Sequence, residues 1–243
     1  MSRSVSATPG VLRSVVVTGV ARRGQIGDVI ARAFAASGHR VSIVAKSIDD
    51  AKACAAEMRG DRLDAHPFAC DLTDPVAAAE LARQVLTNAG RVDTLVNVAG
   101  GFAMSGPVAE SNPAVWAQQL AINLGTAYAA TRAFLPAIRD ARGAIVYLAS
   151  ATALPGARVK NAAAYAAAKG GVLTLMRAVA QEEHANGVRA NAVAPGTVRT
   201  PDNVAAMPTD AAFVEPESIA SVVLFLCSPQ AAQITGQVIE LTP

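Results

Sequence analysis

A tyrosine and a lysine four residues apart are the residues of this sequence best suited to chemistry. Tyr165 and Lys169 occur in the segment Ala-Ala-Ala-Tyr-Ala-Ala-Ala-Lys. Residues at i and i+4 lie on one face of a helix, which would place the ammonium group beside the phenol. A neighbouring cation lowers the pKa of a tyrosine from its usual value of about 10. The pair therefore predicts a group that exchanges a proton with a substrate oxygen, although an ordinary helical contact has the same spacing.

The elements that would position this pair alternate regularly along the chain. Short apolar segments predict strands at Ser14–Thr18, Arg40–Ala45, Ala65–Ala69, Thr94–Val98, Ala144–Ala149, Arg189–Val193 and Val238–Leu241. Longer segments of helical period predict helices at Ile26–Ser37, Ile48–Met58, Pro75–Ala89, Pro113–Asp140, Asn161–Asn186 and Pro216–Cys227. This alternation is typical of an α/β fold, a Rossmann-type, doubly wound, seven-stranded parallel sheet with helices on both faces. Ligands bind such sheets outside the carboxyl ends of the strands.

A glycine-rich segment follows the first predicted strand. It reads Thr-Gly-Val-Ala-Arg-Arg-Gly-Gln-Ile-Gly and leads into an amphipathic helix. Glycines let the backbone approach a pyrophosphate, and the helix that follows offers free N–H groups. A plain turn between a strand and a helix would have the same composition. The segment predicts a dinucleotide site with the cofactor-binding residues Gly19, Arg22, Arg23, Gly24, Gln25 and Ile26.

The end of the second strand bears on the choice of cofactor. An acidic residue usually holds the ribose 2′-hydroxyl of NAD at this place. Here Ala45 is followed by Lys46 and Ser47. A 2′-phosphate needs a cation, and Arg22 and Arg23 could reach the same phosphate. The sequence therefore favours NADP(H), held by Lys46 and Ser47, with NAD(H) and plain surface charge as the alternatives.

The remaining strand ends add further candidates. Asp71 and Leu72 follow the third strand, where they could contact the adenine edge. The fourth strand ends in Asn-Val-Ala-Gly-Gly, which lets the chain pass close to a cofactor. After the sixth strand, a Pro-Gly turn would lie against the nicotinamide. These two segments contribute the candidate cofactor-binding residues Asn97, Ala99, Gly100, Pro195, Gly196, Val198 and Thr200.

Taken in this order, the motifs resemble the short-chain dehydrogenase/reductase family over Ser14–Leu241. The resemblance is carried by Thr18-Gly19…Gly27, Asp71, Asn97-Val-Ala-Gly, Asn123, Ser150, Tyr165-Ala-Ala-Ala-Lys169 and Pro195-Gly196. It implies that Tyr165 is the general acid and that Lys169 holds the cofactor ribose and lowers the pKa of Tyr165. Ser150 would hydrogen-bond the substrate oxygen, and Asn123 would anchor a water that links Lys169 to solvent. The resemblance also implies a homotetramer or a homodimer.

Several departures from the family pattern affect the substrate. The glycine-rich loop is about two residues longer than usual and is similar to that of enoyl-acyl-carrier reductases. Those enzymes carry their tyrosine seven residues before the lysine, where this chain has Ala162. Ser150 lies 15 residues before Tyr165, about two more than is common, so we place an insertion in Leu154–Asn161; Thr152 has the common spacing. The segment after the Pro-Gly turn is short, which implies an open pocket, and resembles the same piece of dihydropteridine reductases.

We therefore expect NADPH-dependent reduction of a ketone, an aldehyde or a 3-oxoacyl group, in a reversible reaction. Reduction of a dihydropteridine or an enoyl group is the first alternative. A catalytically silent protein that binds NADP(H) and reports redox state is the second, and it would be expected to lose members of the set Asn123, Ser150, Tyr165 and Lys169.

Composition excludes several other classes. The chain has 243 residues, 16% of them charged, and a net charge of +2, which argues against a nucleic-acid partner. No apolar segment approaches the length of a membrane span. Cys54, Cys70 and Cys227 are dispersed, have no metal-ligand spacing and suit a reducing cytoplasm. We expect a short mobile leader at residues 1–11, followed by one catalytic domain at 12–243.

Overall fold

The structure is a computed structural model and describes residues 13–243. Seven parallel strands form the centre of its fold. The strands are β1 (Ser14–Thr18), β2 (Arg40–Ala45), β3 (Ala65–Ala69), β4 (Thr94–Asn97), β5 (Ala144–Leu148), β6 (Arg189–Pro195) and β7 (Val238–Leu241). They pair in the order β3-β2-β1-β4-β5-β6-β7. The chain runs outward in both directions from β1 and β4, so a crevice opens between their carboxyl ends. The expected leader at residues 1–11 lies outside the described residues.

The strands are short apolar segments because helices cover both faces of the sheet. Every residue of β1 and of β5 is buried. Within β1, Val15 and Val17 pack on one side of the sheet and Val16 packs on the other. Both faces of this strand therefore bury β-branched side chains, which strands accommodate well.

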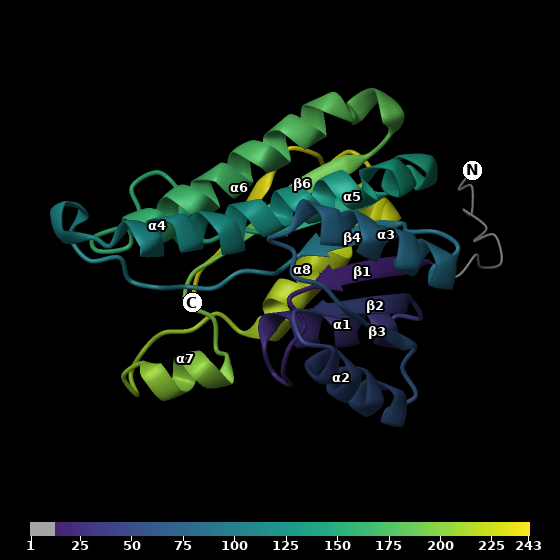
Figure 1. Cartoon of the computed structure of the whole chain (residues 1–243), viewed down its shortest axis with the longest axis horizontal. Helices are drawn as coiled ribbons and strands as arrows, with labels where there is room; N and C mark the ends of the chain where they lie inside the picture. The colour runs from purple at the N-terminus through teal and green to yellow at the C-terminus, as the bar shows by residue number, and fades with distance from the viewer. Residues whose placement is uncertain (1–12) are drawn as a thin grey trace, which may run out of the picture.

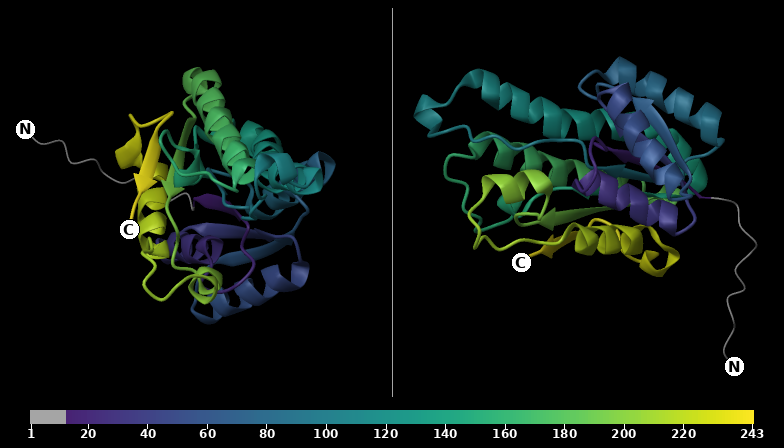
Figure 2. Two further views of the ribbon diagram at one scale, coloured as in Figure 1. Left: turned by 90° about the vertical axis from the view of Figure 1, so that its left-hand side faces the viewer. Right: turned by 90° about the horizontal axis from the view of Figure 1, so that it is seen from below.

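The helices form one layer on each face. They are α1 (Ile26–Ala36), α2 (Ile48–Gly60), α3 (Pro75–Ala89), α4 (Pro113–Gln119), α5 (Thr126–Ala141), α6 (Ala163–Glu182), α7 (Pro201–Ala206) and α8 (Pro216–Cys227). Figures 1 and 2 show α1, α2 and α8 on one side of the sheet and α3, α5 and α6 on the other. Phe34 and Ile219 anchor the first layer, and Phe134 and Met176 anchor the second. None of the helices within residues 13–243 has both the length and the hydropathy of a membrane span.

The predicted fold class is confirmed, and the predicted strands agree with the structure to within two residues. The main difference lies in the helix predicted at Pro113–Asp140. It is divided into α4, a π-helical segment at Leu120–Gly125, and α5. The side chain of Asn123 in this segment donates to the carbonyl oxygen of Gln119 at 3.1 Å, and Thr126 Oγ1 donates to that of Ile122 at 2.7 Å. Side chains therefore bond to the backbone where the helix widens, and such single π turns often mark functional sites.

Helix α7 is the other difference, because no helix was predicted between β6 and α8. It begins at a proline and is capped by Thr200, whose side chain accepts from the backbone of Asn203. In Figure 1, α4 and α7 lie toward the left-hand end of the molecule, where the strands have their carboxyl ends. The residues expected to form the site meet at this same end.

Candidate active site

Helix α6 presents the tyrosine and the lysine on one face, as their spacing predicts. The Nζ atom of Lys169 lies 5.8 Å from the centre of the Tyr165 ring. Lys169 is buried and donates to the carbonyl oxygen of Leu148, at the end of β5, at 2.8 Å. Burial disfavours the ammonium form and lowers the pKa of Lys169 to about 8. Lys169 is therefore fixed against the strand end, with a pKa close to neutral pH.

The pKa of Tyr165 differs from the prediction. Burial raises it, and the hydrogen bond with the side chain of Ser150 lowers it to a smaller extent. The pKa of Tyr165 is therefore raised and not lowered as predicted, because burial outweighs the hydrogen bond with Ser150. The phenol therefore holds its proton at neutral pH, as a group that donates a proton must.

Ser150 is the hydroxyl that meets Tyr165. It lies two residues after the end of β5 and is buried. Its Oγ atom accepts from the backbone N–H of Thr152 at 3.3 Å and from Thr152 Oγ1 at 3.0 Å. Thr152 thus fixes the position of the Ser150 hydroxyl through two hydrogen bonds. This arrangement agrees with an insertion after Ser150, where Gly156 and Asn161 both have positive φ.

Asn123 joins the π-helical segment to the loop that follows β4. It is fully buried, and its amide exchanges two hydrogen bonds with Gly101: Nδ2 donates to the carbonyl oxygen at 2.9 Å, and Oδ1 accepts from the N–H at 3.2 Å. A Cβ atom at Gly100 would lie 2.5 Å from Asn123 Oδ1 and 3.5 Å from Lys169 Nζ. Gly100 therefore lets Asn123 and Lys169 approach one another. The water that Asn123 would anchor stays a prediction.

The glycine-rich loop closes tightly in spite of its extra length. Gly19 has a φ of +74°, and a Cβ atom there would lie 2.8 Å from the backbone of Ala99. A Cβ atom at Gly27 would lie 2.5 Å from the carbonyl oxygen of Gly19. The backbone of α1 thus packs directly on the end of β1, and Gln25, the residue before the helix, provides no side-chain cap. These features fit a pyrophosphate at the start of α1.

Asp28 organises the added part of this loop, and sequence reasoning missed it. Its buried carboxylate accepts from the N–H of Gly24 at 2.9 Å, where φ is +77°. Arg32 neutralises it at 2.9 Å. The sequence signal that could have identified this role of Asp28 is an acidic residue in the first helical turn, four positions after a glycine.

All three cations expected to bind a 2′-phosphate form exposed ion pairs. Arg22 pairs with Asp202 at 2.5 Å, Arg23 with Glu57 at 3.3 Å, and Lys46 with Asp71 at 2.7 Å. Hydrogen bonding to Lys46 is the main reason why the pKa of Asp71 falls to about 2. Exposed pairs of this kind contribute at most about 1 kcal/mol, so a bound phosphate can replace the carboxylates.

The other predicted cofactor-binding residues lie at the same edge of the sheet with varied roles. Ser47 caps α2 by accepting from the backbone of Asp50, and Thr200 caps α7. Asn97 is buried and donates to Thr131 at 3.2 Å, while its Oδ1 atom has no hydrogen-bond partner within residues 13–243. Ile26 is the first residue of α1, and Leu72 and Val198 are buried. Ala99 and Gly100 lie in the loop after β4. Pro195 is the last residue of β6 and directly precedes Gly196.

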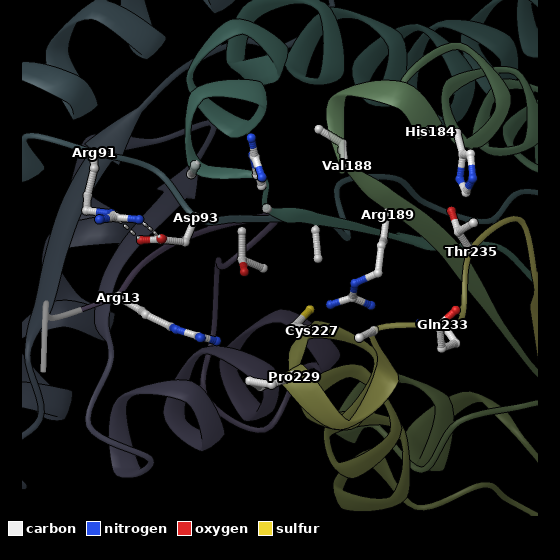
Figure 3. A pocket seen from close by; sticks show the side chains of 17 residues that line it. Arg13, Arg91, Asp93, His184, Val188, Arg189, Cys227, Pro229, Gln233 and Thr235 are labelled. Carbon is white, nitrogen blue, oxygen red and sulfur yellow. Dashed lines mark hydrogen bonds and ion pairs between the residues drawn. The ribbon is translucent and has the colours of Figure 1, made fainter. Parts of the chain in front are cut away.

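Phe102 is a second residue that sequence reasoning did not single out. Its ring stands edge-on to the ring of Tyr165, with 5.1 Å between the ring centres and an angle of 86° between the planes. The side chain is 60% exposed, so it borders the space in front of the phenol. A separate cavity of about 690 Å³ lies at the amino ends of the strands (Figure 3), and none of these residues lines it.

Comparison with known proteins points to one family. The sequence pattern of the family described as short chain dehydrogenase matches residues 13–210. D-threitol dehydrogenase of Mycolicibacterium smegmatis is 34% identical over 233 residues, which cover 91% of this chain and 88% of that one. The 3-oxoacyl-[acyl-carrier-protein] reductase of Bos taurus is 33% identical over 176 residues, which cover 72% of each.

A solved structure of similar shape agrees with this result. A variant of actinorhodin polyketide ketoreductase, crystallised with NADPH, matches with a TM-score of 0.86 and 27% identity. The match covers 95% of this chain and 96% of that one. The similarity thus extends over the whole sheet and both helical layers.

Proposed function

The chain belongs to the short-chain dehydrogenase/reductase family of NAD(P)-dependent oxidoreductases, and we propose that it reduces a ketone or an aldehyde to an alcohol with NADPH. The observation that carries this proposal is the arrangement at the end of β5 and on α6. A partly buried phenol bonded to Ser150 stands beside a buried lysine, with Asn123 nearby. The relatives include by name a D-threitol dehydrogenase and a 3-oxoacyl reductase, and these activities support the proposal.

The side chains have complementary roles in this reaction. Bound NADPH supplies the hydride, which adds to the carbonyl carbon and leaves negative charge on the oxygen. Ser150 donates a hydrogen bond to that oxygen, and Tyr165 transfers its proton to it. The raised pKa of Tyr165 keeps the phenol protonated before the transfer. Lys169, with a pKa of about 8, is suited to hold the cofactor ribose and to return a proton toward Tyr165.

The glycine-rich loop and its neighbours fit NADP(H). The close packing of Gly27 on Gly19 and the uncapped start of α1 leave backbone N–H groups for a pyrophosphate. Lys46 follows the second strand, Arg22 and Arg23 belong to the glycine-rich loop, and no carboxylate follows that strand directly. The charge of Asp28 does not oppose this site, because Arg32 neutralises it.

Lys46→Asp is expected to weaken NADPH binding at least about tenfold and to leave NADH binding unchanged or improved. The substitution replaces the cation by a carboxylate, which repels a 2′-phosphate and accepts a hydrogen bond from a 2′-hydroxyl. Fluorescence titration of both cofactors measures the effect. Lys52→Asp, at an exposed position on α2, is the matched control and should change neither affinity. Equal affinities of the unmodified protein for NADPH and NADH would refute the preference.

Ser150→Ala is expected to lower kcat by about a hundredfold, whereas Thr152→Ala lowers it only severalfold. Ser150 contacts the phenol, and Thr152 acts on Ser150 from behind through the 3.0 Å hydrogen bond. Steady-state kinetics of the two variants with the same ketone decide between them. The reverse order of effects would move the insertion to a position before Ser150 and assign the substrate hydroxyl to Thr152.

The substrate is a small carbonyl compound or a 3-oxoacyl thioester. Relatives that act on a polyol and on a 3-oxoacyl group support both classes. Loss of NADPH absorbance with a panel of ketoses, simple ketones, aldehydes and acetoacetyl thioester tests the proposal. Turnover of a quinonoid dihydropteridine alone would make the chain a dihydropteridine reductase. Tight NADPH binding with no turnover of any compound would make it a sensor.

The protein is expected to act as a homodimer or a homotetramer in the cytoplasm. Tyr128 on α5 and Trp116 on α4 are large side chains that are 50% and 43% exposed, and α5 and α6 are the helices expected at the interface. All three cysteines are unpaired, which fits a reducing compartment.

A further inference from the structure

A cavity of about 690 Å³ opens at the amino ends of β4, β5 and β6 (Figure 3). Its walls come from the start of these strands, the end of α5, the end of α8 and the loop before β7. Arg189 begins β6 and Pro195 ends it. At about 3.3 Å per residue, the strand separates the cavity from the active-site edge by roughly 20 Å.

The walls of this cavity are strongly cationic. Its charged lining consists of the four arginines Arg13, Arg91, Arg142 and Arg189 and the single acid Asp93, together with His184. Asp93 is already engaged: Arg91 binds its carboxylate through two N–H groups, and the backbone N–H of Ser14 donates to it at 2.9 Å. The negative charge of the cavity is thus neutralised, and three arginines remain in excess.

These three arginines have no carboxylate within 4.0 Å among the residues that the structure describes. The sequence of residues 1–12 contains no aspartate or glutamate that could supply one. In Figure 3, Arg13 and Arg189 reach into the cavity from opposite sides, with Cys227 between them. The nearby Arg13 adds to the effect of burial in lowering the pKa of Arg189. Like charges thus converge here without compensation.

One guanidinium group, that of Arg189, is held by hydrogen bonds, and the aliphatic stem of Arg142 is held by packing. Arg189 donates to the carbonyl oxygens of Leu226 at 2.5 Å and Ser228 at 3.2 Å, at the end of α8. The stem of Arg142 packs on Gly187, where an added Cβ atom would lie 3.5 Å from three of its carbons. A cation near the carboxyl end of a helix, as Arg142 is for α5 and Arg189 for α8, also interacts favourably with the helix dipole. That effect accounts for Arg142 and Arg189 singly, but not for Arg13 or for the approach of Arg13 and Arg189 to one another in the same cavity.

We propose that this cavity binds a small polyphosphate ligand, independently of the cofactor. Arginine matches phosphate through paired N–H groups, and three uncompensated arginines suit a ligand with several negative charges. The volume falls in the usual range for small-molecule sites and would hold a molecule of nucleotide size. Thr94 and Gln233 add uncharged hydrogen-bonding groups to the walls.

Calorimetric titration with inorganic tripolyphosphate tests this proposal, with NADP⁺ present at saturation to fill the cofactor site. One equivalent is expected to bind and to raise the melting temperature. The Arg13→Gln variant should bind about tenfold more weakly, and the Arg13→Gln/Arg142→Gln double variant more weakly still. The matched control Arg59→Gln/Arg83→Gln removes two exposed arginines elsewhere and should bind as the unmodified protein does.

Three results would overturn the proposal. Tripolyphosphate binding that NADP⁺ abolishes would assign the ligand to the cofactor site. Equal losses in the cavity variants and in the control would show a general charge effect. The absence of any binding at millimolar tripolyphosphate would show that the cavity takes no polyphosphate. The single variant Arg13→Gln keeps the test decisive if the double variant does not fold, because Arg13 is exposed.

Discussion

The Tyr165→Phe variant is expected to lose at least about a hundredfold in kcat for carbonyl reduction, while its affinity for NADPH stays within about twofold of the unmodified protein. The substitution removes only the hydroxyl that donates the proton, and positioned proton donors contribute about a hundredfold or more to rate. The aromatic ring remains, so the contact with Phe102 and the packing on α6 are kept. Steady-state kinetics and cofactor titration on the same preparation measure the two quantities.

Tyr128→Phe is the matched control for this variant. Tyr128 lies on α5 with half of its surface exposed, and its loss of a hydroxyl should leave kcat unchanged. If Tyr165→Phe kept more than about a tenth of the original kcat, the proton would come from another group. The role assigned to the Tyr165 phenol would then be withdrawn.

Lys169→Met is expected to lower kcat by about a hundredfold and to weaken cofactor binding about tenfold. Methionine keeps most of the volume of the buried side chain but removes the cation and the hydrogen bond to Leu148. The cofactor ribose and the proton supply would both lose a partner, so two parameters change where Tyr165→Phe changes one. Lys160→Met, in the exposed loop before α6, should change neither parameter.

The unmodified protein provides an independent check on Lys169. Burial lowers its pKa to about 8, so the ammonium form predominates below that pH and is lost above it. The kcat for reduction should therefore fall as the pH rises through about 8. Lys169→Met has no such group, and its residual rate should show no step there. A step of the same size in the variant would assign the titration to another residue.

The sequence predicts the fold well because the signals are local. Apolar segments such as Val15–Val17 and the amphipathic period of α1 identify strands and helices without knowledge of their neighbours. Parallel topology then brings the strand ends to one edge, which is why Ser150 and Tyr165 could be placed together. The spacing of Tyr165 and Lys169 predicts their proximity, and the structure agrees.

The features that escaped prediction depend on contacts between distant segments. The π-helical segment forms where Asn123 bonds to Gly101, and Asp28 acts on the loop only once α1 has formed. The pairing of Lys46 with Asp71 joins the ends of two different strands. The predicted direction of the Tyr165 pKa shift was wrong for a related reason. Spacing along a helix shows which charges are near, but the extent of burial follows from the packed structure.

The central claim is that hydride goes to a carbonyl carbon, whose oxygen then takes the proton of Tyr165. The most direct test uses NADPH that carries deuterium at the transferred position, with acetoacetyl thioester and crotonyl thioester offered together. Mass spectrometry and NMR of the products locate the deuterium. The account predicts deuterium on the carbinol carbon of the 3-hydroxyacyl product and no labelled product from the crotonyl compound. Deuterium on the third carbon of a saturated butyryl thioester, with the acetoacetyl compound unchanged, would contradict it.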